Sequence, residues 1–358
     1  MHDLVFCALN LPTINYKISL LFTRTFFVIF FTAISVTVKA QLKRYTFTES
    51  KMGSPFMLVM YCNDSVQAAE LAGKSYKLID SFINIFSDYI NSSELMQLNA
   101  TAGVNAAPVK VSPALLEILL LSKKAFSESS GSFDITIGPL VKLWRIARKT
   151  KQLPDKEKIA AAKSSTGFNH LMIDSVEKTA ILTKQGMSID LGGIAKGWIA
   201  QKIIDFLHTQ NITNALADAG GDIAMSAAPV GTQGWTIGVN IPERQEELLD
   251  QSLLLQNKSV ATSGDAYQFV EKDGKRYSHI VDPQTGFGVT FQRNVTIIAN
   301  DGATADWLAT ACSILPIKKA KKLAMKMGAE LLIAANKNDK FVFYSTKGFN
   351  QYWKQRVL

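Results

Sequence analysis

The order of helix-type and strand-type segments constrains the fold of this chain more than any other sequence feature. Apolar residues recur every three or four positions over 64–87, which predicts a long amphipathic helix. The two segment types are mixed without regular βαβ alternation, which indicates one compact unit of the α+β class. Further helices are predicted at 112–127, 194–209, 303–315 and 317–327. Strands or extended pieces are predicted at 131–138, 169–174, 180–183, 187–190, 215–217, 222–226, 235–240, 277–281 and 295–299, with a hairpin at 331–335 and 341–345.

Composition excludes several classes of protein. With 358 residues, of which 47% are hydrophobic and 19% charged, the chain is neither disordered nor a coiled coil. The 39 basic and 30 acidic residues give a formal charge of +9, but the basic residues are scattered. An ordinary solvated surface is therefore favoured, with an anionic ligand or membrane as the alternative and nucleic acid less favoured. Four His and three Cys exclude a zinc ribbon, a disulfide-dense scaffold and an iron–sulfur protein.

Residues 1–40 have the pattern of a secretory signal peptide. Lys17 and Arg24 precede an apolar run at 26–38, and Val38 and Ala40 form a cleavage-type pair. The run is shorter than the roughly 20 residues that span a membrane, although an uncleaved anchor is the alternative. We therefore expect residues 41–358 to be the exported domain, in the periplasm or associated with the periplasmic side of the membrane. For Cys62 and Cys312, two buried free thiols are favoured over a disulfide.

The segment 188–197 is suited to bind an anion. A predicted strand ends at Asp190, Gly192 and Gly193 form a turn, and a helix begins near Ile194. The free N–H groups and positive dipole end of such a helix attract phosphate. Lys196 in the first turn opposes the dipole, so we expect it to serve a bound phosphate and to add nothing to the stability of the unliganded protein. The alternative is a packing turn with an exposed lysine.

The segment 305–311 is suited to bind a metal ion. Asp306 and Thr310 are four residues apart and share one helix face, where their oxygens suit Mg²⁺. The alternative is that Asp306 only favours the helix start and Thr310 bonds to a carbonyl group.

Two further regions offer a base and an aromatic surface. His279 stands in a strand that runs into a Pro/Gly turn, beside the motif 261–265, and is a candidate general base or acid. Phe133 and Asp134, with the glycine turn before Asp222, suit a stacked and hydrogen-bonded heterocycle. Ordinary turn and strand packing is the alternative for both regions.

In this order, the motifs resemble those of the ApbE family of FAD:protein FMN transferases over about residues 45–349. The resemblance is carried by Met52-Gly53, 86–89, 93–94, 98–99, 131–134, 138–140, 190–197, 220–222, 261–265, 279–283 and 305–310. It implies an exported, Mg²⁺-dependent enzyme that splits the FAD pyrophosphate. FMN would pass as a phosphoester to a Thr or Ser hydroxyl of an acceptor flavoprotein, and AMP would be released. The acceptor would carry a Ser/Thr-Gly-Ala-Thr-like motif and belong to a membrane redox complex.

The resemblance also implies roles for individual residues. It implies that Mg²⁺ is bound by Asp306, Thr310 and the carbonyl oxygen of Gly193. Ser132 stands where the family often has Ala, and Ala309 replaces an oxygen-bearing residue that often precedes the metal threonine. The resemblance also implies that FAD is bound by eight residues, namely Met52, Tyr89, Ser132, Phe133, Asp134, Asp190, Lys196 and Ile280.

The catalytic residues expected from these assignments are His279, Asp306 and Lys196. Lys196 and Asp306 would neutralise charge on the phosphates, directly or through the metal. His279 would take the proton of the acceptor hydroxyl, with Asp265 or Asp282 orienting or replacing it. Two other functions remain open, namely a FAD pyrophosphatase that gives FMN and AMP and a non-enzymatic FAD-binding protein.

Overall fold

An antiparallel sheet of eight strands organises the part of the chain that the computed structural model describes, residues 42–240, 249–264, 268–290, 292–337 and 340–355. The predicted signal peptide, Asp265 and the hairpin turn at 338–339 lie outside these residues. The α+β class is confirmed, because helices accompany a sheet in which every pairing is antiparallel. In spatial order the strands are β1 (Lys43–Lys51), β2 (Ser54–Cys62), β6 (Ala215–Ala219), β7 (Ile223–Met225), β10 (Lys258–Gly264), β13 (Arg293–Ala299), β14 (Glu330–Lys337) and β15 (Lys340–Ser345).

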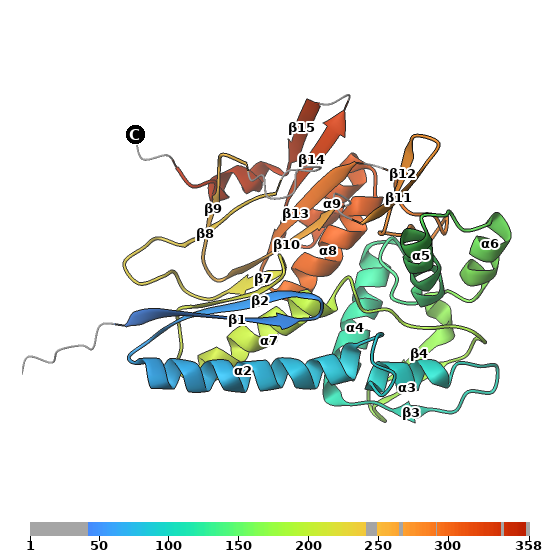
Figure 1. Cartoon of the computed structure of the whole chain (residues 1–358), viewed down its shortest axis with the longest axis horizontal. Helices are drawn as coiled ribbons and strands as arrows, with labels where there is room; N and C mark the ends of the chain where they lie inside the picture. Colours follow the sequence, from blue (N-terminus) through green and yellow to red (C-terminus); the bar gives the residue numbers. More distant parts are fainter. Residues whose placement is uncertain (1–41, 241–248, 265–267, 291, 338–339, 356–358) are drawn as a thin grey trace, which may run out of the picture. The chain divides into compact units, whose positions relative to one another are not determined.

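Side chains of the sheet alternate between two hydrophobic cores. In β14, Leu331 and Ile333 belong to one core and Leu332 to the other, as the two-residue period of a strand requires. The larger core lies under four helices: α2 (Ser65–Phe86), α7 (Ala195–Thr209), α8 (Gly302–Ile314) and α9 (Ile317–Lys326) (Figure 1). The opposite face is covered by β8 (Trp235–Ile237), β9 (Leu253–Leu255) and the 3₁₀ helix η2 (Lys347–Tyr352). The central strands of the sheet, such as β13, are therefore buried on both faces, whereas the edge strands β1 and β15 are partly exposed.

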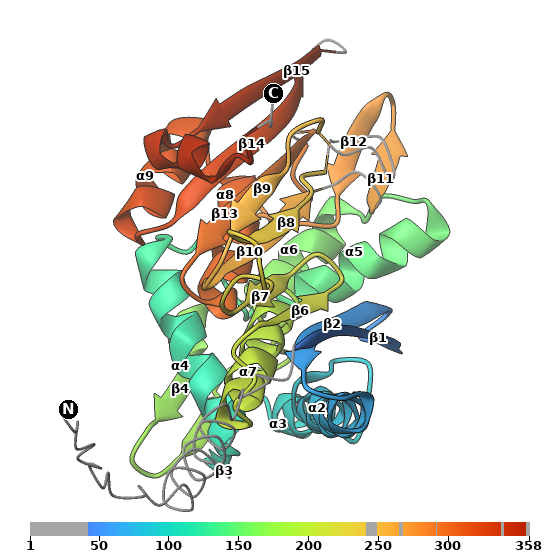
Figure 2. The ribbon, with the colours of Figure 1, turned by 90° about the vertical axis from the view of Figure 1, so that its left-hand side faces the viewer.

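The remaining elements lie outside the main sheet. A third core around Trp144 joins α5 (Gly138–Thr150) and α6 (Lys156–Ser164) to the hairpin of β11 (Phe269–Lys272) and β12 (Lys275–Ser278) (Figure 2). The other elements are α3 (Glu94–Ala100), α4 (Pro113–Glu128), η1 (Phe168–His170) and the small sheet β3 (Val109–Lys110), β5 (Thr179–Leu182) and β4 (Leu171–Asp174).

The predicted helix starts are confirmed by side-chain caps. Asp64, Ser112 and Asp301 each accept a hydrogen bond from the backbone N–H three residues later, at the starts of α2, α4 and α8. Such caps satisfy an N–H group that the helix itself leaves without a partner. Local sequence therefore determines where these helices begin.

Five predicted strands are wrong at their ends or throughout. The segment 169–174 is a strand only from Leu171, the segment 235–240 ends as a strand at Ile237, and three others differ for a common reason. The segment 187–190 makes only an isolated bridge, from Ser188 to Ile137, and 131–138 is mostly turn. The strand before His279 ends at Ser278. In each of these three segments, a side-chain oxygen accepts a hydrogen bond from a backbone N–H group that a strand would use for pairing. The acceptors are the side chains of Asn99 for the N–H of Ile189, Asp134 for that of Thr136, and Ser278 for that of Ile280.

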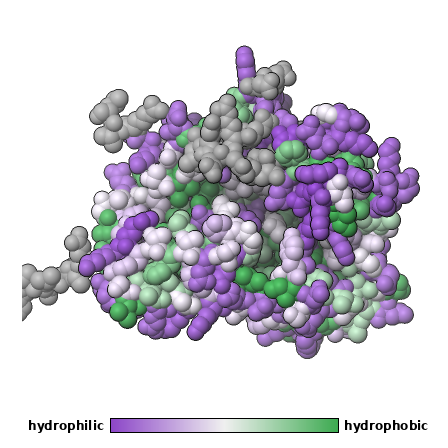
Figure 3. All heavy atoms as spheres, viewed as in Figure 1, coloured by the Kyte–Doolittle hydropathy of each residue, from purple (hydrophilic) through white to green (hydrophobic). Residues whose placement is uncertain are grey.

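The two cysteines of the described residues are in the state that the sequence predicts. Cys62 and Cys312 are free and buried, as expected, and burial raises the pKa of Cys312 to about 12. Within the described ranges, no helix combines the length and apolar character that a membrane crossing requires. On the face seen in Figure 3, hydrophilic and hydrophobic side chains are interspersed.

Arg293 is the residue whose loss should most weaken α8. Its buried guanidinium donates to the carbonyl oxygens of Cys312, Ser313 and Leu315 at the end of the helix. We expect Arg293→Leu to lower the free energy of unfolding by about 3 kcal/mol, because buried carbonyl groups lose their donor. Urea denaturation measures this, and Arg44→Leu on the exposed side of β1 is the control. Equal stability of the two variants would contradict the assignment.

Candidate active site

One cavity of about 880 Å³ collects the residues to which the sequence assigned FAD, metal and the catalytic base, but not Asp282. This volume is typical of a pocket for a large cofactor or substrate. Its walls come from the β1–β2 turn, the end of α2, α5, the start of α7, β10, α8 and the segment after β12. The lining includes Met52, Tyr89, Ser132, Phe133, Asp134, Asp190, Gly193, Lys196, His279, Ile280, Asp306 and Thr310.

The start of α7 is held against α8 by two glycines. A Cβ atom on Gly197 would collide with the carbonyl oxygen of Gly302, and one on Gly302 with that of Gly197. Because neither residue has a side chain, Asp306 reaches the helix start and accepts a hydrogen bond of 3.0 Å from the Gly197 N–H. The α7 helix has no side-chain cap from its own N-cap residue, Ile194. Asp306 thus serves as a cap from a neighbouring helix.

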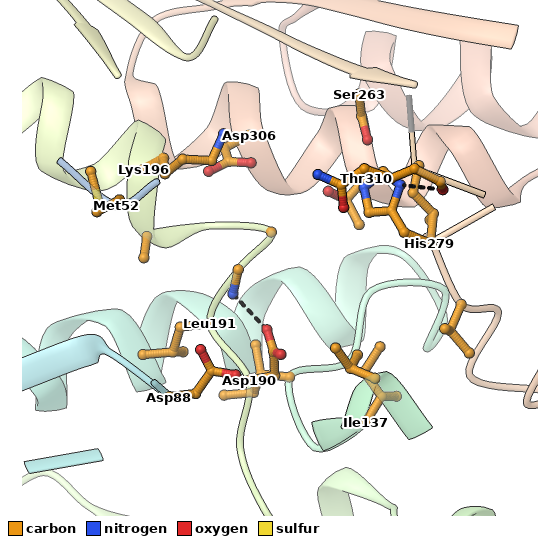
Figure 4. A pocket seen from close by; sticks show the side chains of 18 of the residues that line it. Met52, Asp88, Ile137, Asp190, Leu191, Lys196, Ser263, His279, Asp306 and Thr310 are labelled. Atoms are coloured by element: carbon orange, nitrogen blue, oxygen red, sulfur yellow. Dashed lines mark hydrogen bonds between the residues drawn. The ribbon is translucent and has the colours of Figure 1, made fainter. Parts of the chain in front are cut away.

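Lys196 is surrounded by carboxylates. Its ammonium group pairs with Asp222, which is buried, and also lies in the field of Asp306 and Asp218. Burial would lower the pKa of Lys196, but the attraction of Asp222 and Asp306 raises it above the ordinary value. Figure 4 shows Lys196 and Asp306 meeting in the cavity. This ion pair with a buried carboxylate argues against the expectation that Lys196 adds nothing to the stability of the unliganded protein, which stays to be tested.

This group of charges fits a bound cation. Three carboxyl groups, those of Asp222, Asp306 and Asp218, surround the single ammonium group of Lys196. Burial, and then repulsion by Asp222, raises the pKa of Asp306 well above its ordinary value. Thr310 follows one turn later, and its Oγ1 lies 3.0 Å from where a Cβ on Gly193 would stand. Among the described residues no three His, Cys, Asp or Glu side chains gather as metal ligands. A metal ion bound to Asp306 would therefore also need the Thr310 hydroxyl and a backbone oxygen such as that of Gly193.

A second set of charged groups forms another wall of the cavity. Arg145 of α5 pairs with Asp88 and, at 2.8 Å, with Asp190, and its guanidinium lies 4.5 Å from the centre of the Tyr89 ring. Asp190 also accepts a bond of 2.8 Å from the Gly192 N–H. Burial, and then the charge of Asp88, raises the pKa of Asp190 to about 6. Arg145 thus joins three separate chain segments of the wall.

Sequence reasoning missed Arg145 because it did not predict α5. A side-chain cap is the usual local signal of a helix start. This helix begins at Gly138-Pro139 and has no such cap. A signal was present, since Leu140, Trp144 and Ala147 recur at helical spacing and all three are buried.

The loop before α5 places its aromatic ring inside the wall. Phe133 is buried, with its ring 6.1 Å from that of Trp307. Burial raises the pKa of the Asp134 carboxyl, although bonds from the N–H and hydroxyl of Thr136 oppose the rise. Asp134 therefore shapes its own loop as well as lining the cavity, whereas Tyr89 is largely exposed at the opening.

His279 is held in the neutral form that can accept a proton. Its backbone N–H donates to the Gln268 carbonyl oxygen at 2.7 Å, and its Nδ1 lies 3.3 Å from the same oxygen. Burial, and then the nearby charge of Arg148, lowers the pKa of His279 to about 4. Asp282 instead accepts bonds from Gln284 and Thr285, so it orders the following turn. The alternative in which Asp282 orients His279 thus has no supporting hydrogen bond among the described residues.

The comparison with protein families identifies relatives of the chain. A model described as the ApbE family matches residues 52–333. A protein of Klebsiella pneumoniae strain 342 named FAD:protein FMN transferase is 34% identical over 277 residues, which are 77% of this chain and 84% of the relative. A protein of the same name from Escherichia coli K12 is 28% identical over 81% of this chain and 83% of its own length.

Solved structures give the same result for the fold. The flavin transferase ApbE of Vibrio cholerae aligns with a TM-score of 0.77 and 26% identity, over 87% of this chain and 99% of that one. The ApbE protein of Thermotoga maritima aligns with a TM-score of 0.78 and 28% identity, over 87% of this chain and all (100%) of that one.

The ion pair of Lys196 can be tested by stability alone. We expect Lys196→Met to lower the free energy of unfolding by roughly 2 kcal/mol, because Asp222 stays buried without its partner. Adding Asp222→Asn should restore at least half of the loss. Denaturation of the FAD-free protein measures both effects, with Lys202→Met on the same helix as a control. A Lys196→Met protein as stable as the wild type would show that Lys196 is only a solvated charge.

Proposed function

The chain belongs to the ApbE family, and from this premise we propose that its cavity binds FAD and that the protein transfers FMN to an acceptor protein. The relatives named FAD:protein FMN transferase support this function over most of the chain. The observation that carries it is the layout of the cavity. Lys196 and the turn before α7 suit phosphates, while Phe133, Tyr89 and Arg145 suit a flat ring system.

We propose Mg²⁺ as the metal, held by Asp306, Thr310 and the carbonyl oxygen of Gly193. The excess of buried carboxylate charge around Lys196 supports a divalent cation at this place. When bound, Mg²⁺ would neutralise charge on the pyrophosphate oxygens. Lys196 would hold the same phosphates from the first turn of α7.

The proposed reaction replaces the phosphoanhydride bond of FAD with a phosphoester bond to the acceptor. The acceptor hydroxyl oxygen forms a bond to the phosphorus atom of the FMN half of FAD. The bond from that phosphorus to the bridging oxygen breaks, and AMP leaves with the bridging oxygen. His279 takes the hydroxyl proton; because Nδ1 faces the Gln268 carbonyl oxygen, Nε2 is the free base.

An assay separates this function from its two alternatives. Protein beginning at residue 41 is incubated with FAD, Mg²⁺ and a domain that carries a Ser-Gly-Ala-Thr sequence. Flavin fluorescence attached to the acceptor after denaturation supports transfer. Free FMN and AMP without labelled acceptor would indicate a pyrophosphatase, and unchanged FAD a binding protein.

Asp306→Asn should separate catalysis from folding. The amide oxygen can still accept the hydrogen bond from Gly197, and the repulsion with Asp222 disappears, so we expect thermal stability at least equal to wild type. Transfer should fall by about 100-fold or more, because a charged metal ligand is lost. Asp205→Asn, at an exposed position of α7, is the control. Normal transfer by Asp306→Asn would leave Asp306 only its capping role.

We also propose that the protein works outside the cytoplasm, on an acceptor that belongs to a membrane redox complex. The support is the sequence pattern of residues 1–40. Sequencing the N-terminus of protein from the producing cell should find residue 41 or one close to it. Intact Met1 on cytoplasmic protein would refute export.

A further inference from the structure

Two arginines one turn apart on α5 line the cavity in different electrostatic states. Arg145 is neutralised by two carboxylates, those of Asp88 and Asp190. Arg148 donates to the side-chain oxygen of Gln268, a neutral amide. Within the described ranges, no carboxylate lies at ion-pair distance from Arg148. The α5 wall therefore presents one compensated and one uncompensated cation.

Arg148 is poorly satisfied as a hydrogen-bond donor. A guanidinium carries several N–H groups in a planar fork, and the Nε of Arg148 is buried without a partner among the described residues. Burial, and then the charge of Arg145, lowers its pKa, although Tyr89 opposes the shift. A cation in this state gains from an anionic ligand, and a carboxylate matches the guanidinium fork best among protein side chains.

Gln268 connects this cation to the proposed base. Its side-chain oxygen accepts from Arg148, while its backbone oxygen accepts from the N–H of His279. All three residues line the same cavity. The phosphates of FAD already have Lys196 and the start of α7, on another element. Arg148 is thus free to meet a second molecule, at the place where His279 would meet the acceptor hydroxyl.

We propose that Arg148 and Gln268 form a subsite for an acidic side chain of the acceptor polypeptide, close to its target hydroxyl. This inference rests on the proposed transferase function. A carboxylate on Arg148 orients the acceptor segment, so that its hydroxyl approaches Nε2 of His279. Arg148 is then a residue that determines which acceptors are used, and it takes no part in holding FAD.

The test pairs enzyme variants with acceptor variants. Wild type, Arg148→Gln and Lys149→Gln are assayed with the Ser-Gly-Ala-Thr domain and with versions in which each acidic residue near the threonine is replaced by its amide. Lys149 is the adjacent exposed cation on the same helix and serves as the matched control. Thermal unfolding verifies folding, and FAD affinity is measured by fluorescence titration.

We expect one acidic-to-amide change to lower kcat/KM of the wild type about tenfold, the size of a charge-assisted hydrogen bond. Arg148→Gln should lose about as much with the parent acceptor and should no longer distinguish the two acceptors. Lys149→Gln should behave as the wild type, and FAD affinity should be unchanged in all three proteins. If Arg148→Gln does not fold, Arg148→Lys takes its place, and it should keep part of the preference.

Two outcomes would overturn the inference. One is equal use of all acceptor versions by the wild type, and the other is a weaker FAD affinity in Arg148→Gln, which would place FAD on Arg148. A wild-type enzyme that labels no acceptor would instead refute the proposed function itself. The two failures are therefore distinguishable.

Discussion

The contact between the start of α7 and α8 is the constraint on which the candidate site depends. At Gly197 and Gly302 the two backbones approach so closely that neither position has room for a side chain. This approach lets Asp306 bind the Gly197 N–H while Thr310 faces Gly193. Lys196, one residue from the contact, is thereby fixed among its carboxylates. Any substitution that separates the helices would disturb the proposed phosphate-binding and metal-binding groups together.

The charges of the cavity are incomplete without ligands. Around Lys196, three carboxyl groups, those of Asp222, Asp306 and Asp218, face a single ammonium group. On α5 positive charge is in excess at Arg148. A cation is expected at the first place and an anion at the second, so the unliganded protein already distinguishes the two kinds of group.

Local sequence predicted α2, α4, α7, α8 and α9, but it missed α3, α5 and α6 and several segments that cross the site. Capping residues such as Asp64 and Asp301 stand next to the helices that they cap, so short-range patterns were sufficient. The segment 187–190 was mistaken for a strand because its partner, Asn99, is distant in sequence. The partner of Asp222 was also not foreseen: its glycine turn indicated a heterocycle site, and the fold in addition pairs it with Lys196. Such pairings depend on tertiary structure and leave no local pattern.

The α8 helix is anchored at both ends. Its start is pressed against α7 through Gly302, and its last carbonyl groups are held by Arg293, which projects from β13. A helix fixed in this way cannot slide along its axis or rotate to bring other residues to the cavity. A substitution on the cavity side of α8 would therefore change a side chain at a fixed position and leave the others where they are. The anchored helix thus keeps Asp306 and Thr310 at a fixed spacing along the cavity wall.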